Sequence, residues 1–230
     1  MTSLSAELVA LAEEIDQQTA PRLRQVLRQF IERLQRQHAA QRSLKVGNLA
    51  PDFILKNQNQ RAVRLYDQLQ QGPVVLVFFR GGWCPFCNLT LQAWRHTLPD
   101  IEFQGGQLLA VTPETGEYAQ RTVQKNKLAF SVLQDTGGEV ARLFKVSIAL
   151  SEYLAAFYRS LGLNLATRHQ DSVVRLPMPA TYLIDSNGII RYAFVAEDYT
   201  QRANITEVLK ELEQLGKTTK PLYPPTFAVA

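Results

Sequence analysis

The chain has 230 residues, of which 46% are hydrophobic, 20% are charged and 9% are aromatic, and its formal net charge is +4. This apolar content excludes a mainly disordered chain, and the longest apolar run, residues 74–79, is far shorter than the roughly 20 residues of a membrane span. The first 18 residues hold four acidic and no basic side chains, unlike a secretory leader, so we expect a cytosolic protein.

Residues 1–46 are predicted to form a helical extension of two amphipathic helices. In the first, apolar residues recur at helical spacing up to Ile15. Pro21 suits the first turn of the second helix, whose apolar stripe runs from Leu23 to Leu34. Such a stripe is buried either against the rest of the chain or against a second subunit, so a homodimer is one alternative.

The second predicted helix also carries many basic side chains. Between Pro21 and Lys45 the sequence has seven basic residues and one acidic residue, Glu32, which gives a net charge of 7 − 1 = +6. Basic faces of this kind occur in proteins that bind nucleic acids or membrane surfaces, and also in ordinary solvated helices. We interpret this face as solvated and expect neither a nucleic acid nor a membrane as partner.

Residues 47–216 are predicted to form one α/β domain. Segments 53–55 and 62–65 flank a polar turn and predict a hairpin, and the valine-rich run 74–79 predicts a buried strand. Further strands are expected at 107–111, 131–133, 182–185 and 189–195, and helices at 85–98, 116–126, 138–144 and 201–215. This order indicates a central sheet covered by helices on both faces.

Two segments lie outside this alternation. Residues 148–176 resemble an insertion, in which apolar side chains recur at helical spacing from Leu150 to Leu161. Its basic side chains include Arg159, Arg168, His169 and Arg175. The insertion is either a lid over the functional site that supplies a cation, or a packed helix or dimer contact. Residues 217–230 contain three prolines and are expected to form an extended tail.

The two cysteines of the chain lie three residues apart, in the sequence Trp83-Cys84-Pro85-Phe86-Cys87. They follow a predicted strand and a glycine turn and open a predicted helix, whose free N–H groups and partial positive charge favour a thiolate. Pro85 suits the first helical turn, and the spacing lets the two sulfurs form a disulfide. We therefore predict a redox pair that cycles between dithiol and disulfide.

Other roles for the cysteines fit the residues less well. A structural zinc site needs four ligands, and His38, His96 and His169 show no paired spacing. Two inert buried cysteines are a further alternative, but the junction of strand and helix favours redox chemistry. We expect neither a metal nor a cofactor.

Five motifs follow one another between residues 47 and 215. They are Ala50-Pro51-Asp52-Phe53, the strand 73–79, Val111-Thr112-Pro113-Glu114, the segment 135–141 and the hairpin 181–191. In this order they resemble peroxiredoxins of the alkyl hydroperoxide reductase/thiol-specific antioxidant (AhpC/TSA) family. The resemblance implies a thioredoxin fold of the peroxiredoxin type, a mixed sheet flanked by helices. It also implies an antioxidant enzyme that reduces hydroperoxides with electrons from a thioredoxin or glutathione system.

The cysteine motif departs from the peroxiredoxin pattern Pro-x-x-x-Thr-x-x-Cys. Laid on this chain, the pattern places the peroxide-attacking cysteine at Cys87, with Cys84 at the threonine position and Arg80 at the proline position. The family's arginine before the late strand is replaced by Pro179. The resemblance thus implies attack by Cys87, with Arg80 as a supporting residue.

The same residues also resemble thioredoxins, whose working motif is Trp-Cys-x-x-Cys. That similarity implies a thiol-disulfide oxidoreductase without peroxidase activity, in which Cys84 attacks a disulfide substrate and Cys87 resolves, with Trp83 and Pro85 in support. It further implies a cis bond between Met178 and Pro179 that faces the cysteines. A hydroperoxide reductase, a disulfide oxidoreductase and a redox sensor without turnover are the functions left open.

Overall fold

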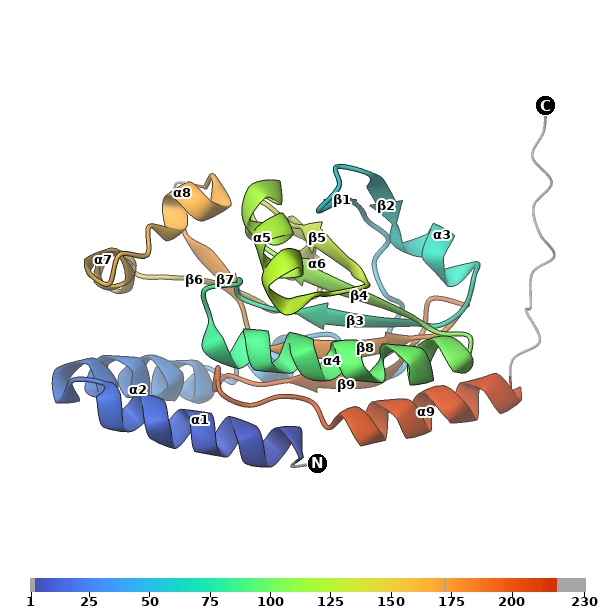
Figure 1. Ribbon diagram of the computed structural model, residues 1–230, viewed down its shortest axis with the longest axis horizontal. Helices are drawn as coiled ribbons and strands as arrows, with labels where there is room; N and C mark the ends of the chain where they lie inside the picture. The colour runs from blue at the N-terminus through green and yellow to red at the C-terminus, as the bar shows by residue number, and fades with distance from the viewer. Residues whose placement is uncertain (1–2, 172, 219–230) are drawn as a thin grey trace.

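The computed structural model describes residues 3–171 and 173–218, and its centre is a mixed sheet of seven strands (Figure 1). The strand order is β2-β1-β5-β4-β3-β8-β9. The strands are β1 (Ile54–Asn57), β2 (Ala62–Arg64), β3 (Val74–Phe78), β4 (Gln107–Thr112), β5 (Ser131–Gln134), β8 (Ala180–Ile184) and β9 (Ile190–Val195). The central strand β3 runs parallel to β4 and antiparallel to β8. This confirms the predicted mixed sheet and its hairpins.

Helices cover both faces of the sheet, which is why every residue of β3 is buried. They are α3 (Leu65–Leu69), α4 (Pro85–Phe103), α5 (Gly116–Asn126), α6 (Glu139–Leu143) and α9 (Ile205–Thr218). Because side chains alternate along a strand, Leu76 and Phe78 pack into one core with α3 and α6. Val75 and Val77 pack into a second core with α4, α5 and α9. The cysteine motif lies at the start of α4, and both cysteines belong to the second core.

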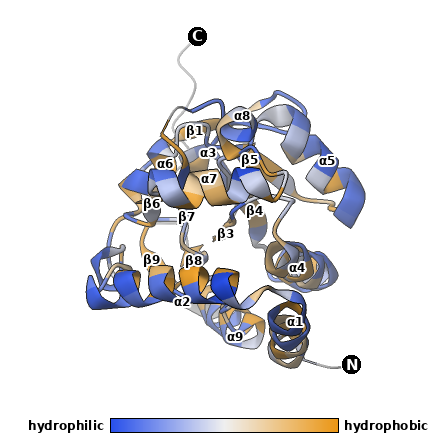
Figure 2. Ribbon diagram, turned by 90° about the vertical axis from the view of Figure 1, so that its left-hand side faces the viewer, coloured by the Kyte–Doolittle hydropathy of each residue, from blue (hydrophilic) through white to orange (hydrophobic). Residues whose placement is uncertain are grey.

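The two predicted N-terminal helices are present as α1 (Leu4–Gln18) and α2 (Pro21–Arg36), followed by a short 3-10 helix (Ala40–Arg42). Leu8 of α1 packs into the core beneath α4, and Leu34 of α2 packs into the opposite core. Hydrophobic and hydrophilic residues alternate along α2 in Figure 2, as an amphipathic helix requires. The apolar stripe is therefore buried at least in part against the chain's own domain. Within the described residues, no helix is both long and apolar enough to cross a membrane.

The insertion folds as a unit of its own beside the start of α4. Strands β6 (Ser147–Ala149) and β7 (Arg175–Pro177) form a second, two-stranded sheet. Between them lie α7 (Glu152–Ser160), which the apolar spacing predicted, and α8 (Leu165–His169). The insertion has a small hydrophobic core, against which Val26 and Phe30 of α2 and Trp83 of the cysteine motif pack. Sequence periodicity missed these three elements because they are short. Helix α8 is shorter than two helical turns, and β6 and β7 are each shorter than a typical strand.

Several predicted boundaries were wrong. Helix α4 continues through Pro99 to Phe103, because Ile101 is fully buried and anchors the last turn in the core. Helix α9 begins at Ile205 rather than 201, after a loop in which the Asn204 side chain accepts a hydrogen bond from the N–H of Thr206. Residues 217 and 218 belong to α9 and not to the predicted tail. The rest of that tail, residues 219–230, lies outside the described residues.

The predicted cis bond before Pro179 was also wrong, because the described residues contain no cis peptide bond. Pro179 lies in the connection between β7 and β8, and two backbone hydrogen bonds hold this connection in place. The Met178 N–H donates to the Val146 carbonyl (2.8 Å), and the Pro179 carbonyl accepts from the Ala196 N–H (3.2 Å). The chain passes from β7 to β8 without a tight turn, which is where cis-prolines usually occur.

The core beneath α4 gives a direct test of the packing. Trp94 is only 1% exposed and belongs to this core, whereas Phe103 at the end of the same helix is 91% exposed. We expect Trp94→Ala to lower the free energy of unfolding by about 3–5 kcal/mol, because it leaves a large cavity. Phe103→Ala is the matched control and should change it by less than about 0.5 kcal/mol. Urea unfolding measures both, and equal losses would contradict this placement of α4.

Candidate active site

Both cysteines lie at the N-terminus of α4. Cys84 is the N-cap residue, Pro85 occupies the first turn, and Cys87 follows within that turn. Both side chains are buried, with 2% and 1% of Cys84 and Cys87 exposed, and both are free thiols. The predicted strand-turn-helix arrangement of the pair is confirmed.

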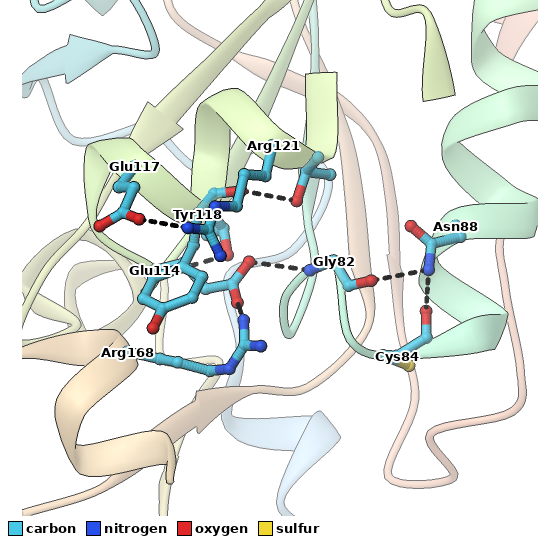
Figure 3. Close-up of polar contacts among 10 residues, drawn as sticks. Gly82, Cys84, Asn88, Glu114, Glu117, Tyr118, Arg121 and Arg168 are labelled. Atoms are coloured by element: carbon cyan, nitrogen blue, oxygen red, sulfur yellow. Dashed lines mark hydrogen bonds and ion pairs between the residues drawn. The ribbon is translucent and has the colours of Figure 1, made fainter. Parts of the chain in front are cut away.

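The turn that leads from β3 into α4 is held at both backbone polar groups of Gly82. The N–H of Gly82 donates to Glu114 Oε2 at 2.8 Å, and Asn88 Nδ2 donates to the Gly82 carbonyl at 2.8 Å and to the Cys84 carbonyl at 3.1 Å (Figure 3). Gly82 leaves no room for a side chain, because a Cβ there would lie 2.1 Å from Thr122 Oγ1. These contacts fix the backbone from which both sulfurs project.

Glu114 joins this turn to the insertion. Its carboxylate is fully buried and accepts from Arg168 Nη1 of α8 at 2.8 Å, while the Arg168 guanidinium lies over the Tyr118 ring at 4.2 Å (Figure 3). Burial raises the pKa of Glu114, and the hydrogen bond from Gly82 and the charge of Arg168 oppose that rise. Sequence analysis placed Glu114 in a family motif but gave it no role, and a cation supplied by the insertion was one of two alternatives that it left open.

Two arginines lie next to the sulfurs. Arg202, in the loop between β9 and α9, points Nη2 at Cys87 Sγ from 3.4 Å, and its Nη1 donates to the carbonyls of Tyr199 and Gln201. Arg80, which follows β3, is 5% exposed and acts electrostatically on both cysteines. Among the described residues, neither arginine forms an ion pair with a carboxylate. Their positive charges are therefore available to the sulfurs.

The surroundings assign different protonation states to the two thiols. Burial alone disfavours a thiolate at Cys87. The hydrogen bond from Cys84, the charge of Arg202 and the backbone N–H of Arg80 outweigh it and lower the pKa of Cys87 to about 5. Cys84 is the donor in that hydrogen bond and is itself buried, so its pKa is raised well above the usual value. These surroundings favour the thiolate at Cys87 over the thiolate at Cys84.

The other predicted supporting residues lie in different places. The Trp83 ring packs against Tyr158 of α7 at 5.4 Å and lies 5.0 Å from the Arg80 guanidinium. Pro85 occupies the first turn of α4 as predicted, whereas the trans bond at Pro179 removes the contact that a cis-proline implies. Sequence analysis missed Arg202, which lies in no motif. In the described part of the chain, no group of three or more His, Cys, Asp or Glu side chains is placed to hold a metal ion.

Comparison with known proteins finds one family. The model of the AhpC/TSA family matches residues 46–193. The chain is 25% identical over 169 residues to peroxiredoxin Q, chloroplastic, from Oryza sativa subsp. japonica, which covers 74% of this chain and 67% of that protein. It is 29% identical over 150 residues to alkyl hydroperoxide reductase E from Mycobacterium bovis, which covers 65% of this chain and 84% of that protein.

Solved structures show the same fold. Peroxidoxin BcpB from Mycobacterium tuberculosis superposes with a TM-score of 0.60 at 19% identity, over 77% of this chain and 99% of that one. A yeast mitochondrial 1-Cys peroxiredoxin, described as resolved via glutathione/thioredoxin systems, superposes with a TM-score of 0.59 at 20% identity, over 80% and 84%. At these identities the likeness establishes the thioredoxin fold of the peroxiredoxin type.

Proposed function

The chain belongs to the AhpC/TSA family and is a peroxiredoxin-like, thiol-dependent oxidoreductase, and from this we propose that Cys87 attacks a hydroperoxide and Cys84 resolves the product. The observation that carries the assignment is the Cys87 sulfur itself. It is buried in the first turn of α4, and Arg202 Nη2 points at it from 3.4 Å. A stabilised thiolate at a helix N-terminus is the reactive form of cysteine.

The reaction divides into three steps whose atoms and electrons balance. The Cys87 thiolate attacks the terminal peroxide oxygen, the O–O bond breaks, and the leaving oxygen takes a proton and departs as an alcohol or water. The Cys84 sulfur then attacks the Cys87 sulfenic acid and expels water, which gives the Cys84–Cys87 disulfide. A dithiol donor returns two electrons and two protons. We propose a thioredoxin or glutathione system as that donor, as described for the yeast relative.

The arginines supply the electrostatic part of the mechanism. As the O–O bond breaks, negative charge moves from sulfur to the leaving oxygen. Fixed donors aimed at that oxygen stabilise it without reorganisation. Arg202 and Arg80 lie beside the sulfur and have no carboxylate partner among the described residues, so they suit this task. They take the place that the family's arginine would occupy, where this chain has Pro179.

The alternative order, with Cys84 as nucleophile, fits the geometry less well. Cys84 donates the hydrogen bond within the pair, and its pKa is raised by that bond and by burial. The Arg202 guanidinium, by contrast, contacts the Cys87 sulfur and favours the thiolate there. The trans bond at Pro179 also lacks the cis-proline on which the comparison with thioredoxin depended.

Stopped-flow tryptophan fluorescence tests the proposed function, because Trp83 adjoins Cys84. The reduced protein is mixed with hydrogen peroxide or with an alkyl hydroperoxide, and free cysteine is the reference. Ionisation alone gives about a 30-fold advantage at neutral pH, since free cysteine is only about 3% thiolate there. We expect a rate constant well beyond that factor for at least one peroxide. Rate constants within that roughly 30-fold factor for both peroxides would contradict a peroxidase, and disulfides would then be the substrates to test.

A further inference from the structure

The insertion places one tyrosine beside the cysteine pair. We propose that Tyr158 of α7 is a positioning residue, whose hydroxyl and ring hold the Arg80 guanidinium beside Trp83 of the cysteine motif. The proposal rests on the proposed function of Cys87, but it concerns a residue outside the cysteine motif. It also gives the insertion a role other than that of a lid or a source of a cation.

The contacts of Arg80 carry the proposal. Its Nη2 donates to the Tyr158 hydroxyl, and no other side-chain acceptor for Arg80 is found among the described residues. Its guanidinium carbon lies 5.0 Å from the ring centre of Trp83, 5.0 Å from that of Tyr199 and 5.8 Å from that of Tyr158. Aromatic faces attract a desolvated cation without neutralising it. An aromatic cage of this kind keeps the full positive charge of Arg80 next to the sulfurs.

Tyr158 is itself held firmly. It is 6% exposed and belongs to the hydrophobic core of the insertion, together with Leu154 and Leu165. Its ring packs edge-on against Trp83 at 5.4 Å, and the side chain of Phe30 in α2 packs against the same core. Because packing on these sides leaves the ring little freedom, the hydroxyl is a fixed acceptor for Arg80.

Loss of that hydroxyl should release Arg80. A guanidinium has several N–H donors and no acceptor, and a buried donor without a partner is costly. Trp83 and Tyr199 of the cage are both half-buried, so we expect the guanidinium to move out past these rings toward water. Cys87 then keeps Cys84 and Arg202 as its stabilising side chains, with Glu114 as the opposing charge. With one cation fewer, the thiolate should form at higher pH and react more slowly.

The test compares two tyrosines of the same helix. Tyr158→Phe removes the hydroxyl and keeps the ring, while Tyr153→Phe makes the same change at a side chain that is 60% exposed. Ultraviolet absorbance of the reduced protein measures thiolate formation against pH, and stopped flow measures the reaction with peroxide. We expect Tyr158→Phe to raise the midpoint by about 0.5 pH unit or more and to slow the reaction about fivefold or more. Tyr153→Phe should leave both unchanged.

A double-mutant cycle shows whether Tyr158 acts through Arg80. In an Arg80→Met background, Tyr158→Phe should have no further effect on the midpoint or the rate. Equal effects in both backgrounds, or none in the wild-type background, would overturn the proposal. If Arg80→Met does not fold, the comparison with Tyr153→Phe decides. If the unaltered protein reduces no peroxide, the proposed function fails, yet the absorbance titration still tests Tyr158.

Discussion

The Cys87→Ser protein should not react with hydroperoxides, whereas the Cys84→Ser protein should still consume about one equivalent and then stop. Cys87 carries the thiolate that attacks the O–O bond, and Cys84 is needed only to resolve the sulfenic acid. Loss of the nucleophile should therefore lower the rate of the first step by a factor of about 1000 or more. Loss of Cys84 removes the hydrogen bond that it donates to Cys87, so a smaller slowing of that step is expected as well.

Stopped flow measures the first step, and mass spectrometry identifies the product. In the Cys84→Ser protein, a sulfenic acid at Cys87 should be captured by a dione reagent, while the unaltered protein should show an internal disulfide instead. The two serine variants are each other's control, since they make the same change three residues apart on one helix. The opposite result, with reaction only when Cys84 is present, would assign the attack to Cys84 and support the thioredoxin-like order.

The parts of the site that sequence analysis predicted are local in the chain. The turn, the helix start, both cysteines and Arg80 lie between residues 80 and 87, where strand, turn and helix signals coincide. Helix geometry then fixes how the two sulfurs face each other, whatever the rest of the fold does. The strands of the seven-stranded sheet were also predicted, most clearly where an apolar run is bounded by turn residues, as in Val74–Phe78.

The missed parts are contacts between distant segments. Arg202 is 115 residues from Cys87 in sequence, Tyr158 is 78 residues from Arg80, and Glu114 is 32 residues from Gly82. The sequence placed Arg202 in the predicted helix 201–215, but it lies in the loop before α9, and nothing local marks it as different from other arginines. Its role depends on the path of the chain between β9 and α9, which folding of the whole domain sets. Sequence analysis noted that Pro179 replaces the family's arginine, and it gave the basic residues of the insertion as one alternative source of that cation.

Arg202 should have the second largest effect. The pKa of Cys87 is lowered to about 5 in the folded protein, so the rate with peroxide should rise with pH through that region and then level off. Arg202→Met removes a cation that favours the charged form. The midpoint must therefore move to higher pH, by about one unit or more. The level of the plateau should also fall, by about 100-fold, because one donor to the leaving oxygen is lost.

The two effects separate two roles of the same side chain. The midpoint reports how Arg202 stabilises the thiolate before reaction, and the plateau, where the sulfur is fully ionised in both proteins, reports how it stabilises the departing oxygen. Stopped-flow rates across the pH range measure both. Arg121→Met, at an exposed arginine of α5, is the control and should change neither.

A shifted midpoint with an unchanged plateau would limit Arg202 to stabilising the thiolate and leave Arg80 to polarise the peroxide. If neither the midpoint nor the plateau changes, the 3.4 Å contact of Arg202 with Cys87 Sγ does not contribute to catalysis. Arg80 alone would then replace the family's arginine, whose position in this chain is held by Pro179.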